Sequence, residues 1–346
     1  MGNRCLKLQF KTKIVNQIEC FLFLHILYRN SIYMETVLIT GGSGLVGKTL
    51  TKHLTGKGYK VIILTRAKTP KDIKDLDDNA QVQYAHWDIV KKTIDIKAVQ
   101  AADYVVHLAG VGVMEKSWTD TFKKEIIASR AESARLIRRT LQKNSNKVKA
   151  VISASAIGWY GADSTPVKPF VETDPSDKGF LGETCRLWEE NADRVKELGK
   201  RLVKFRLGII LSNDGGALVE FKKSLSLGIA GILGNGKQVI SWIHIDDVCR
   251  LFTEAIENEQ LNGVYNAVAP TPVTNKELIT ELAKRIKGKA FIPVYVPKFI
   301  LHMILGQRSI EVLKSATVSC QKIKQTGFTF LYPSIESALD QLIPKK

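Results

Sequence analysis

The chain has 346 residues, of which 45% are hydrophobic and 25% are charged, and its formal net charge is +17. This composition and length are typical of a globular protein with one domain and an additional lobe. The basic residues are scattered and form no run interleaved with aromatic residues, which argues against a nucleic-acid-binding protein and favours a solvated basic surface that attracts anionic small molecules.

The first segment, residues 1–33, contains the apolar stretch Cys20–Tyr28, which is too short to span a bilayer and lacks a small-residue cleavage site. Gly2 follows the first methionine as in myristoylated proteins, but Leu6 stands where that signal requires serine or threonine. Met34 directly precedes the first convincing strand. We therefore predict an extension outside the fold, with no stable membrane insertion; a membrane-surface anchor is the alternative.

From Thr36 onward, short apolar runs alternate with segments of helical spacing. Strands that alternate with helices indicate a parallel sheet covered on both faces, so we predict an α/β fold with a Rossmann-like, doubly wound parallel sheet. The expected strands are 37–40, 60–65, 81–86, 103–108, 148–153 and 202–207, and the expected helices are 45–56, 120–142 and 181–198.

The last third of the chain has few strand signals, and proline punctuates it at Pro293 and Pro297. Helices are predicted at 244–257, 274–287, 297–305 and 335–343. We expect a smaller, mainly helical C-terminal lobe over the carboxyl edge of the sheet, where such sheets bind their ligands. The predicted domains are residues 34–290, which include insertions that form a substrate lobe, and a small C-terminal domain, residues 291–346.

The cysteines are irregularly spaced, and none belongs to a Cys-x-x-Cys pair. This pattern argues against a disulfide framework and against a zinc site, so we expect no metal and a reducing, cytoplasmic location. The five residues are Cys5, Cys20, Cys185, Cys249 and Cys320.

A glycine-rich loop, Thr40–Gly47, lies directly between the first predicted strand and the first helix. Gly41 can form the tight turn, Gly44 allows the backbone to approach a pyrophosphate, and Gly47 allows the helix to pack closely on the strand. The helix N-terminus then offers N–H groups to phosphates. The sequence predicts a dinucleotide site here; a glycine-rich turn without a ligand is the alternative. Its residues are Gly41, Ser43, Gly44, Leu45, Val46 and Gly47.

The second predicted strand ends at Thr65-Arg66-Ala67-Lys68, where an NAD site usually places a carboxylate. Arg66 can instead meet a 2′-phosphate as a planar fork, and Lys68 adds positive charge. The sequence therefore favours NADP(H) over NAD(H) as the cofactor. An exposed loop arginine without this role is the alternative.

With these residues, the chain resembles the extended, or atypical, short-chain dehydrogenase/reductase superfamily. The glycine loop, Asp88 after the third strand and His107–Gly110 after the fourth strand match it. A branch of NAD(P)-dependent sugar-nucleotide epimerases is more similar still. The matching pieces are Leu108–Gly110, Trp118-Thr119, Ser129-Arg130, Ser153–Gly161, Phe205–Gly208 and Ser241–Asp247, and residues 293–339 resemble the small C-terminal domain of unknown function in that branch.

The resemblance, which covers residues 35–343, implies a Rossmann-like sheet with a bound dinucleotide. It implies that Asp88 approaches the adenine and that Leu108, Ala109 and Gly110 line the ribose on the nicotinamide side. Ser129, followed by Arg130, occupies the place where the superfamily often has asparagine. Extended members often dimerise through the helices at 120–142 and 181–198, so a homodimer is expected.

The superfamily uses a Tyr-x-x-x-Lys pair, in which the lysine lowers the tyrosine pKa. In this chain Phe180 and Thr184 stand near the two positions, so the usual pair is absent. The segment 153–161 matches the serine-tyrosine turn of extended members, which implies that Ser155 contacts substrate. Alternatively, its serines satisfy backbone groups at the strand end and Tyr160 packs in the core.

If the chain is an enzyme, another group must act as acid or base. We consider Tyr160 first, Glu183 second and Lys116 third, with Ser155 as a substrate contact. The leading hypothesis is an NADP(H)-dependent epimerase, dehydratase or reductase that transfers a hydride at a carbinol or carbonyl carbon of a small substrate, such as a nucleotide-sugar. The alternative is a protein that binds NADP(H) without turnover, as a sensor or scaffold.

Overall fold

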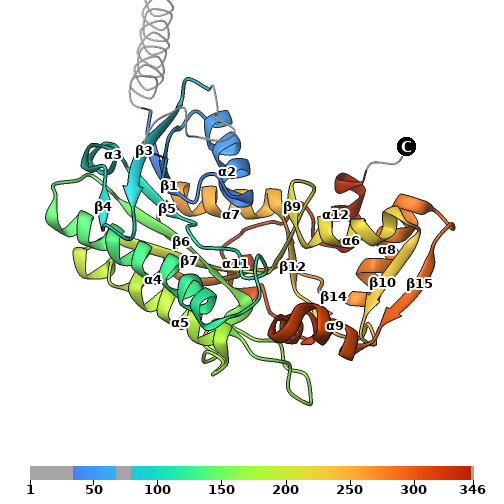
Figure 1. The fold of residues 1–346 in the computed structure, drawn as a ribbon. Helices are drawn as coiled ribbons and strands as arrows, with labels where there is room; N and C mark the ends of the chain where they lie inside the picture. Colours follow the sequence, from blue (N-terminus) through green and yellow to red (C-terminus); the bar gives the residue numbers. More distant parts are fainter. Residues whose placement is uncertain (1–33, 68–78, 344–346) are drawn as a thin grey trace, which may run out of the picture.

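The structure, a computed structural model, describes residues 34–67 and 79–343 (Figure 1). The predicted N-terminal extension and Lys68 therefore lie outside the described residues. No helix in the described ranges is long and apolar enough to cross a membrane. Three cysteines fall within these ranges, and all are buried free thiols: Cys185, Cys249 and Cys320.

A mainly parallel sheet of eight strands forms the centre of the larger domain, in the order β13-β7-β6-β5-β1-β2-β3-β4. The order reverses between β5 and β1, which creates the topological switch point at which such sheets bind ligands. Only β4 runs antiparallel to its neighbour. The strands are β1 (Thr36–Thr40), β2 (Lys60–Thr65), β3 (Val82–Asp88), β4 (Thr93–Ile94), β5 (Tyr104–His107), β6 (Ala150–Ala156), β7 (Arg201–Leu207) and β13 (Gly263–Ala267).

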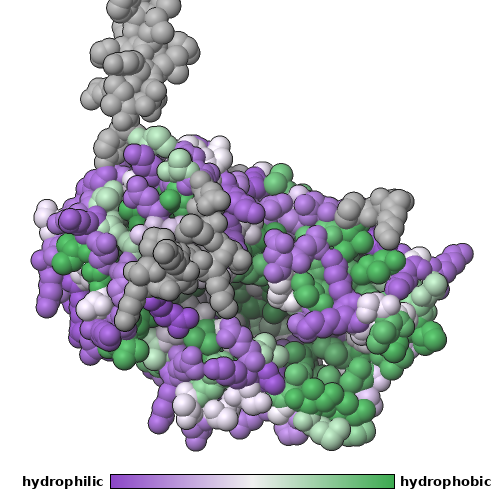
Figure 2. Space-filling view, turned by 45° about the horizontal axis from the view of Figure 1, so that its top comes forward, coloured by the Kyte–Doolittle hydropathy of each residue, from purple (hydrophilic) through white to green (hydrophobic). Residues whose placement is uncertain are grey.

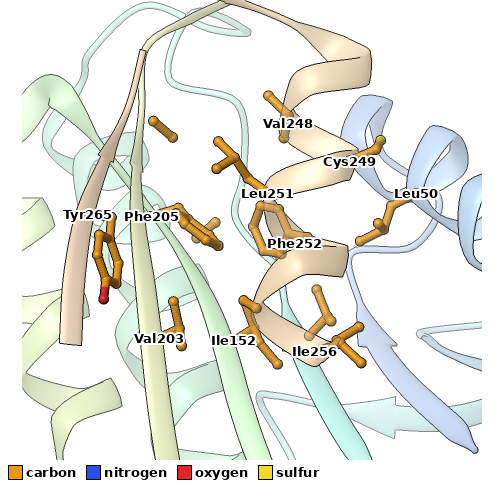
Figure 3. Packing of buried hydrophobic residues seen from close by; sticks show 14 of the residues in the cluster. Leu50, Ile152, Val203, Phe205, Val248, Cys249, Leu251, Phe252, Ile256 and Tyr265 are labelled. Atoms are coloured by element: carbon orange, nitrogen blue, oxygen red, sulfur yellow. The ribbon is translucent and has the colours of Figure 1, made fainter. Parts of the chain in front are cut away.

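Helices cover both faces of this sheet because its central strands are apolar on both sides. On one face, α7 (Ile245–Glu257) places Phe252 over β6 and β7, where it packs on Phe205 with ring centroids 5.2 Å apart (Figure 3). Helix α2 (Leu45–Gly56) lies beside α7. On the other face lie α3 (Ile96–Ala101), α4 (Asp120–Lys143) and α5 (Phe180–Asp193).

The helix predicted at 181–198 is shorter than expected. Helix α5 ends at Asp193, a 3-10 turn follows at Lys196–Leu198, and Gly199 then reverses the chain with φ = 68°. The other predicted helices and strands of residues 36–207 occur within three residues of their expected bounds. The predicted Rossmann-like fold is confirmed.

The lobe is mainly helical, as expected, and it also contains short strands that were not predicted. Two of these strands, β10 (Ile229–Leu233) and β15 (Ile292–Val296), pair in parallel. Residues on both sides of the predicted boundary at 290/291 therefore belong to the lobe. Hydrophobic side chains gather on its surface (Figure 2). The helices of the lobe are α6 (Ala217–Ser226), α8 (Asn275–Lys287), α9 (Lys298–Leu305), α10 (Ser309–Leu313) and α12 (Ile335–Leu342), whereas α11 (Gln321–Lys324) packs on β13 of the large sheet. The strands are β8 (Ile209–Ser212), β9 (Gly215–Gly216), β10 (Ile229–Leu233), β11 (Val239–Ile240), β12 (Trp242–His244), β14 (Val273–Thr274) and β15 (Ile292–Val296).

Candidate cofactor and active site

The glycine loop forms a tight connection from β1 to α2. Gly41 has φ = 71°, and its carbonyl accepts a hydrogen bond from the Gly44 N–H at 3.0 Å. A Cβ on Gly47 would lie 2.3 Å from the Gly41 oxygen and 2.5 Å from Gly42 Cα, so only glycine fits there. Gly44 caps α2 without a side-chain hydrogen bond. The N–H groups of the first helical turn have no intrahelical partner and are available to an anionic ligand.

The segment Leu108–Gly110 lies directly beside this loop. The Thr40 hydroxyl accepts hydrogen bonds from the Leu108 and Ala109 N–H groups, both at 3.2 Å. A Cβ on Gly41 would lie 2.8 Å from the Leu108 carbonyl carbon. The structure thus brings together the two backbone segments that the sequence assigned to a dinucleotide.

Arg66 and Asp88 lie at the same carboxyl edge, on the far side of the glycine loop from β5. Arg66 is exposed just beyond the end of β2. Asp88 ends β3, and its Oδ1 accepts hydrogen bonds from Lys91 N at 3.0 Å and Val90 N at 2.9 Å. These backbone hydrogen bonds, first of all the one from Lys91, lower the Asp88 pKa. Arg66 is exposed and Asp88 is partly exposed.

Ser129 and Arg130, on α4, contact the end of the Leu108–Gly110 segment and the residue that follows it. The Ser129 hydroxyl donates to the Ile126 carbonyl at 2.9 Å and accepts from the Val111 N–H at 3.1 Å. A Cβ on Gly110 would lie 2.9 Å from Arg130 Cζ, so the guanidinium lies against that glycine. Burial lowers the Arg130 pKa, and no carboxylate of the described chain forms an ion pair with it. This site therefore carries an uncompensated positive charge.

His107 is a structural residue below this segment. Its Nε2 lies 2.8 Å from the Ser133 hydroxyl, and its Nδ1 lies 3.2 Å from the Ser153 hydroxyl. The Trp188 indole also donates to Nδ1 at 3.3 Å, which places the ring proton on Nε2. Burial, together with the charge of Arg130, lowers the His107 pKa to about 3, so the ring is neutral at physiological pH.

Tyr160 and Ser155 point into the core. Tyr160 is fully buried, and its hydroxyl donates to Asn266 Oδ1 at 2.7 Å and accepts from Arg206 Nη1 at 2.9 Å. Burial raises the Tyr160 pKa to about 12. The Ser155 hydroxyl donates to Glu189 Oε1 at 2.7 Å. The catalytic roles considered for these two residues do not fit this geometry, because their hydroxyls already have buried partners.

The other two candidates lie apart from them. Glu183, on α5, is half-exposed and accepts a hydrogen bond from Arg186 Nε at 2.7 Å, which lowers the Glu183 pKa. A carboxylate with a lowered pKa is a poor proton donor at neutral pH. Lys116 is exposed and lies 4.0 Å from Glu125 Oε2. Ser155, Tyr160 and Glu183 each already bind a different protein group.

The positions of the missing Tyr-x-x-x-Lys pair have other partners. The Phe180 ring meets the Trp118 ring edge-on, with centroids 4.9 Å apart, and the Lys123 ammonium lies 5.4 Å from the Phe180 centroid. The Thr184 hydroxyl donates to the Phe180 carbonyl at 2.7 Å. Phe180 thus forms an aromatic wall, and Thr184 only satisfies a backbone group of its own helix.

Arg206 belongs to a buried ion pair. Arg206 Nε lies 2.8 Å from Glu189 Oε1, and Lys204 Nζ lies 3.1 Å from Glu189 Oε2 and 2.7 Å from Asp193 Oδ2. The Arg206 guanidinium also lies 3.7 Å from the Trp159 ring centroid. Lys204 and Arg206 are two residues apart in the buried strand β7, so they share one face of the strand. This spacing in the sequence could have indicated a buried network of ion pairs.

The geometry makes a prediction about Tyr160. We expect Tyr160→Phe to lower the free energy of unfolding by about 1–3 kcal/mol, because Asn266 and Arg206 lose a buried hydrogen-bond partner. Cofactor affinity should not change. Urea unfolding and a cofactor titration measure the two effects. The control is Tyr265→Phe, because the Tyr265 hydroxyl accepts only a long bond of 3.4 Å from Asn262 N. Unchanged stability together with lost cofactor binding would contradict this structural role.

A glycine cradle at the switch point of a parallel sheet, with a helix N-terminus aimed at it, defines a dinucleotide-binding protein of the Rossmann type. Comparison with known proteins identifies the family. Residues 37–179 match the NAD dependent epimerase/dehydratase family, and residues 296–342 match a domain of unknown function, DUF1731. The chain belongs to this epimerase family, as its resemblance to the extended superfamily predicted.

Curated relatives match almost the whole chain. It is 34% identical over 313 residues to "Epimerase family protein SAR0825" of Staphylococcus aureus. The alignment covers 90% of this chain and 100% of that protein. It is 32% identical to "Epimerase family protein YfhF" of Bacillus subtilis, with 89% and 97% covered. It is also 32% identical to "Epimerase family protein SDR39U1 homolog, chloroplastic" of Arabidopsis thaliana, with 88% and 85% covered.

Solved structures share the fold. The human epimerase family protein SDR39U1 (isoform 2), crystallised with NADPH, superposes with a TM-score of 0.75 at 27% identity, over 89% of this chain and 99% of that one. The nucleoside-diphosphate sugar epimerase from Corynebacterium glutamicum has a TM-score of 0.70 at 29% identity, over 94% of this chain and 63% of that one.

Proposed function

We propose that this protein binds NADP(H) at the glycine loop and uses it for hydride transfer at a carbinol or carbonyl carbon of a small substrate, such as a nucleotide-sugar. The cradle formed by Gly41, Gly44 and Gly47 carries the proposal, because Cβ atoms on Gly41 and Gly47 would collide with backbone and the α2 N-terminus faces the space that remains. The human relative crystallised with NADPH supports the choice of cofactor.

The residues present fit the parts of this cofactor in order along the sheet edge. The pyrophosphate would lie at the N-terminus of α2, the adenine would extend toward Asp88, and Arg66 would meet the 2′-phosphate. The nicotinamide-side ribose would lie against the backbone of Leu108–Gly110, which Ser129 and Arg130 hold in place. The positive charge of Arg130 favours a ligand that places hydrogen-bond-accepting oxygen atoms at this end of the site.

When bound, the nicotinamide supplies the hydride chemistry, and the chain supplies binding and orientation. Trp118 and Phe180 form an aromatic contact that would reduce the access of water to a nicotinamide bound beside it. Neither Ser155 nor Tyr160 can exchange a proton with substrate while its hydroxyl is bound in the core. The proton of such a reaction therefore comes from outside this pair.

A second candidate function, NADP(H) binding without turnover, is favoured by the same geometry. Phe180 and Thr184 replace the usual pair, and the serine-tyrosine turn is engaged in the core. Incubation with NADP+ and UDP-glucose or UDP-glucuronate, and with NADPH and small carbonyl compounds, separates the two functions when nicotinamide absorbance and the sugar products are both followed. Reduction of NADP+, oxidation of NADPH or formation of an epimerised sugar supports the enzyme; none of these changes, with the nucleotide still bound, supports the binding protein.

The assignment of Arg66 makes a sharp prediction. We expect Arg66→Ala to weaken NADPH binding by about tenfold to a hundredfold, because a charge-assisted hydrogen bond to the 2′-phosphate is lost. NADH affinity should not change. Fluorescence titration with both nucleotides measures the difference. Lys60→Ala is the control, because Lys60 is an exposed cation at the opposite end of β2. An equal loss for NADPH and NADH would contradict a role at the 2′-phosphate.

A further inference from the structure

The strand pair β10–β15 leaves one apolar side without a partner among the described residues. The register places Ile229 opposite Ile292 and Gly231 opposite Val294, so these residues share a face. Ile292 is 68% exposed and Val294 is 41% exposed. On the other face, Ala230 and Ile232 of β10 pack into the lobe core and hold β10 in place.

Helix α9 continues this apolar surface immediately after β15. Phe299, Met303 and Ile304 are 70%, 75% and 65% exposed, whereas Leu301 is buried and anchors the helix. A hollow of about 400 Å³ lies between α9 and α10, with both Lys298 and Phe299 in its lining. We call Leu227, Ile229, Ile292, Val294, Phe299, Met303 and Ile304 the lobe apolar face (Figure 2).

The two segments that carry the lobe apolar face, residues 221–245 and 282–310, contain lysines but no aspartate or glutamate. Lys289 is exposed in the turn before β15, and the Lys287 ammonium donates to the Ser226 carbonyl next to Leu227. Lys298 begins α9. In residues 34–67 and 79–343, no ion pair neutralises Lys287, Lys289 or Lys298.

Exposed apolar surface of this kind marks an interaction site. The charge of the neighbouring lysines indicates which kind of partner binds there. A second copy of the chain would bring the same unpaired lysines together, and like charges at an interface are unfavourable. An anionic bilayer complements both features, because its headgroups attract lysines while apolar side chains enter the acyl boundary. We propose that the lobe apolar face docks on the surface of an anionic lipid bilayer.

Sedimentation of the full chain with vesicles tests this proposal. We expect the protein to bind vesicles of phosphatidylcholine mixed with phosphatidylglycerol, to bind phosphatidylcholine alone far more weakly, and to dissociate as salt is added. Phe299→Ser with Met303→Ser should reduce the partition coefficient by about tenfold or more, because two large apolar side chains no longer enter the lipid. Lys289→Gln with Lys298→Gln should reduce it by about tenfold.

The matched control is Val90→Ser with Lys91→Gln in the β3–β4 turn, where Val90 is 90% exposed. This pair should bind as wild type does. The proposal is overturned if the protein does not sediment with anionic vesicles, if the face variants bind as wild type, or if the control loses as much binding. It is also overturned if light scattering shows a dimer that the Phe299→Ser, Met303→Ser variant converts to a monomer.

Discussion

Replacement of Gly47 by alanine is expected to weaken NADPH binding by about tenfold to a hundredfold. The added Cβ would lie 2.3 Å from the Gly41 oxygen and 2.7 Å from the Gly42 carbonyl carbon, so α2 must move away from the loop. A forced backbone shift of this kind costs about 1–3 kcal/mol, and here it would displace the N–H groups that we propose bind the pyrophosphate. Fluorescence titration with NADPH measures the loss, and circular dichroism verifies that the variant folds.

Gly56, at the end of the same helix, provides the control. A Cβ there would meet nothing within 4 Å, so Gly56→Ala removes a glycine from α2 without a collision. We expect this variant to bind NADPH as wild type does. If Gly47→Ala also retained full affinity, the close packing of α2 on the loop would not be what forms the phosphate site.

Loss of Glu189 is expected to cause the largest loss of stability, about 3–5 kcal/mol for Glu189→Ala. Arg206 and Lys204 are both buried, and Glu189 is the carboxylate that contacts both of them. Its removal leaves a guanidinium without a counter-ion beside the sheet and also removes the acceptor of Ser155. The midpoint of urea unfolding, compared at equal slope, measures the change in the free energy of unfolding.

The neighbouring residue provides the matched comparison. Glu190 is 54% exposed and forms an ion pair with Arg186 on the helix surface. Exposed ion pairs of this kind contribute about 0–1 kcal/mol, so Glu190→Ala should barely shift the unfolding midpoint. Equal effects at both positions would mean that the buried network of Glu189 contributes nothing beyond a surface pair.

Most of the larger elements of the fold could be predicted because their signals are local. Apolar runs and helical spacing identified the β1–α2 unit, and the capping box of Thr274 and Glu277 begins α8 where helical spacing was found. The strand pair β10–β15 was missed because Ile229 and Ile292 come together only through tertiary packing. The edge strand β13 was missed for a related reason, since its run is short and begins at Gly263.

In the candidate site, too, features that depend on local sequence were predicted and features that depend on distant residues were not. The cofactor cradle follows from glycine spacing, and the structure places Gly41, Gly47 and Leu108–Gly110 in contact. The directions of Ser155 and Tyr160 could not be read from the sequence. Their partners, Glu189 and Asn266, are distant in the chain, and those partners decide whether a strand-end hydroxyl faces a ligand or the core.

We propose that this chain holds NADP(H) at its glycine loop. Titration of the wild-type protein with NADPH, followed by nicotinamide fluorescence and run in parallel with NADH, tests it most directly. We predict saturable binding of one NADPH per chain, with NADH bound more weakly because it lacks the 2′-phosphate that Arg66 would meet. Absence of saturable binding for both nucleotides would contradict the claim, and the proposed enzyme would be excluded with it.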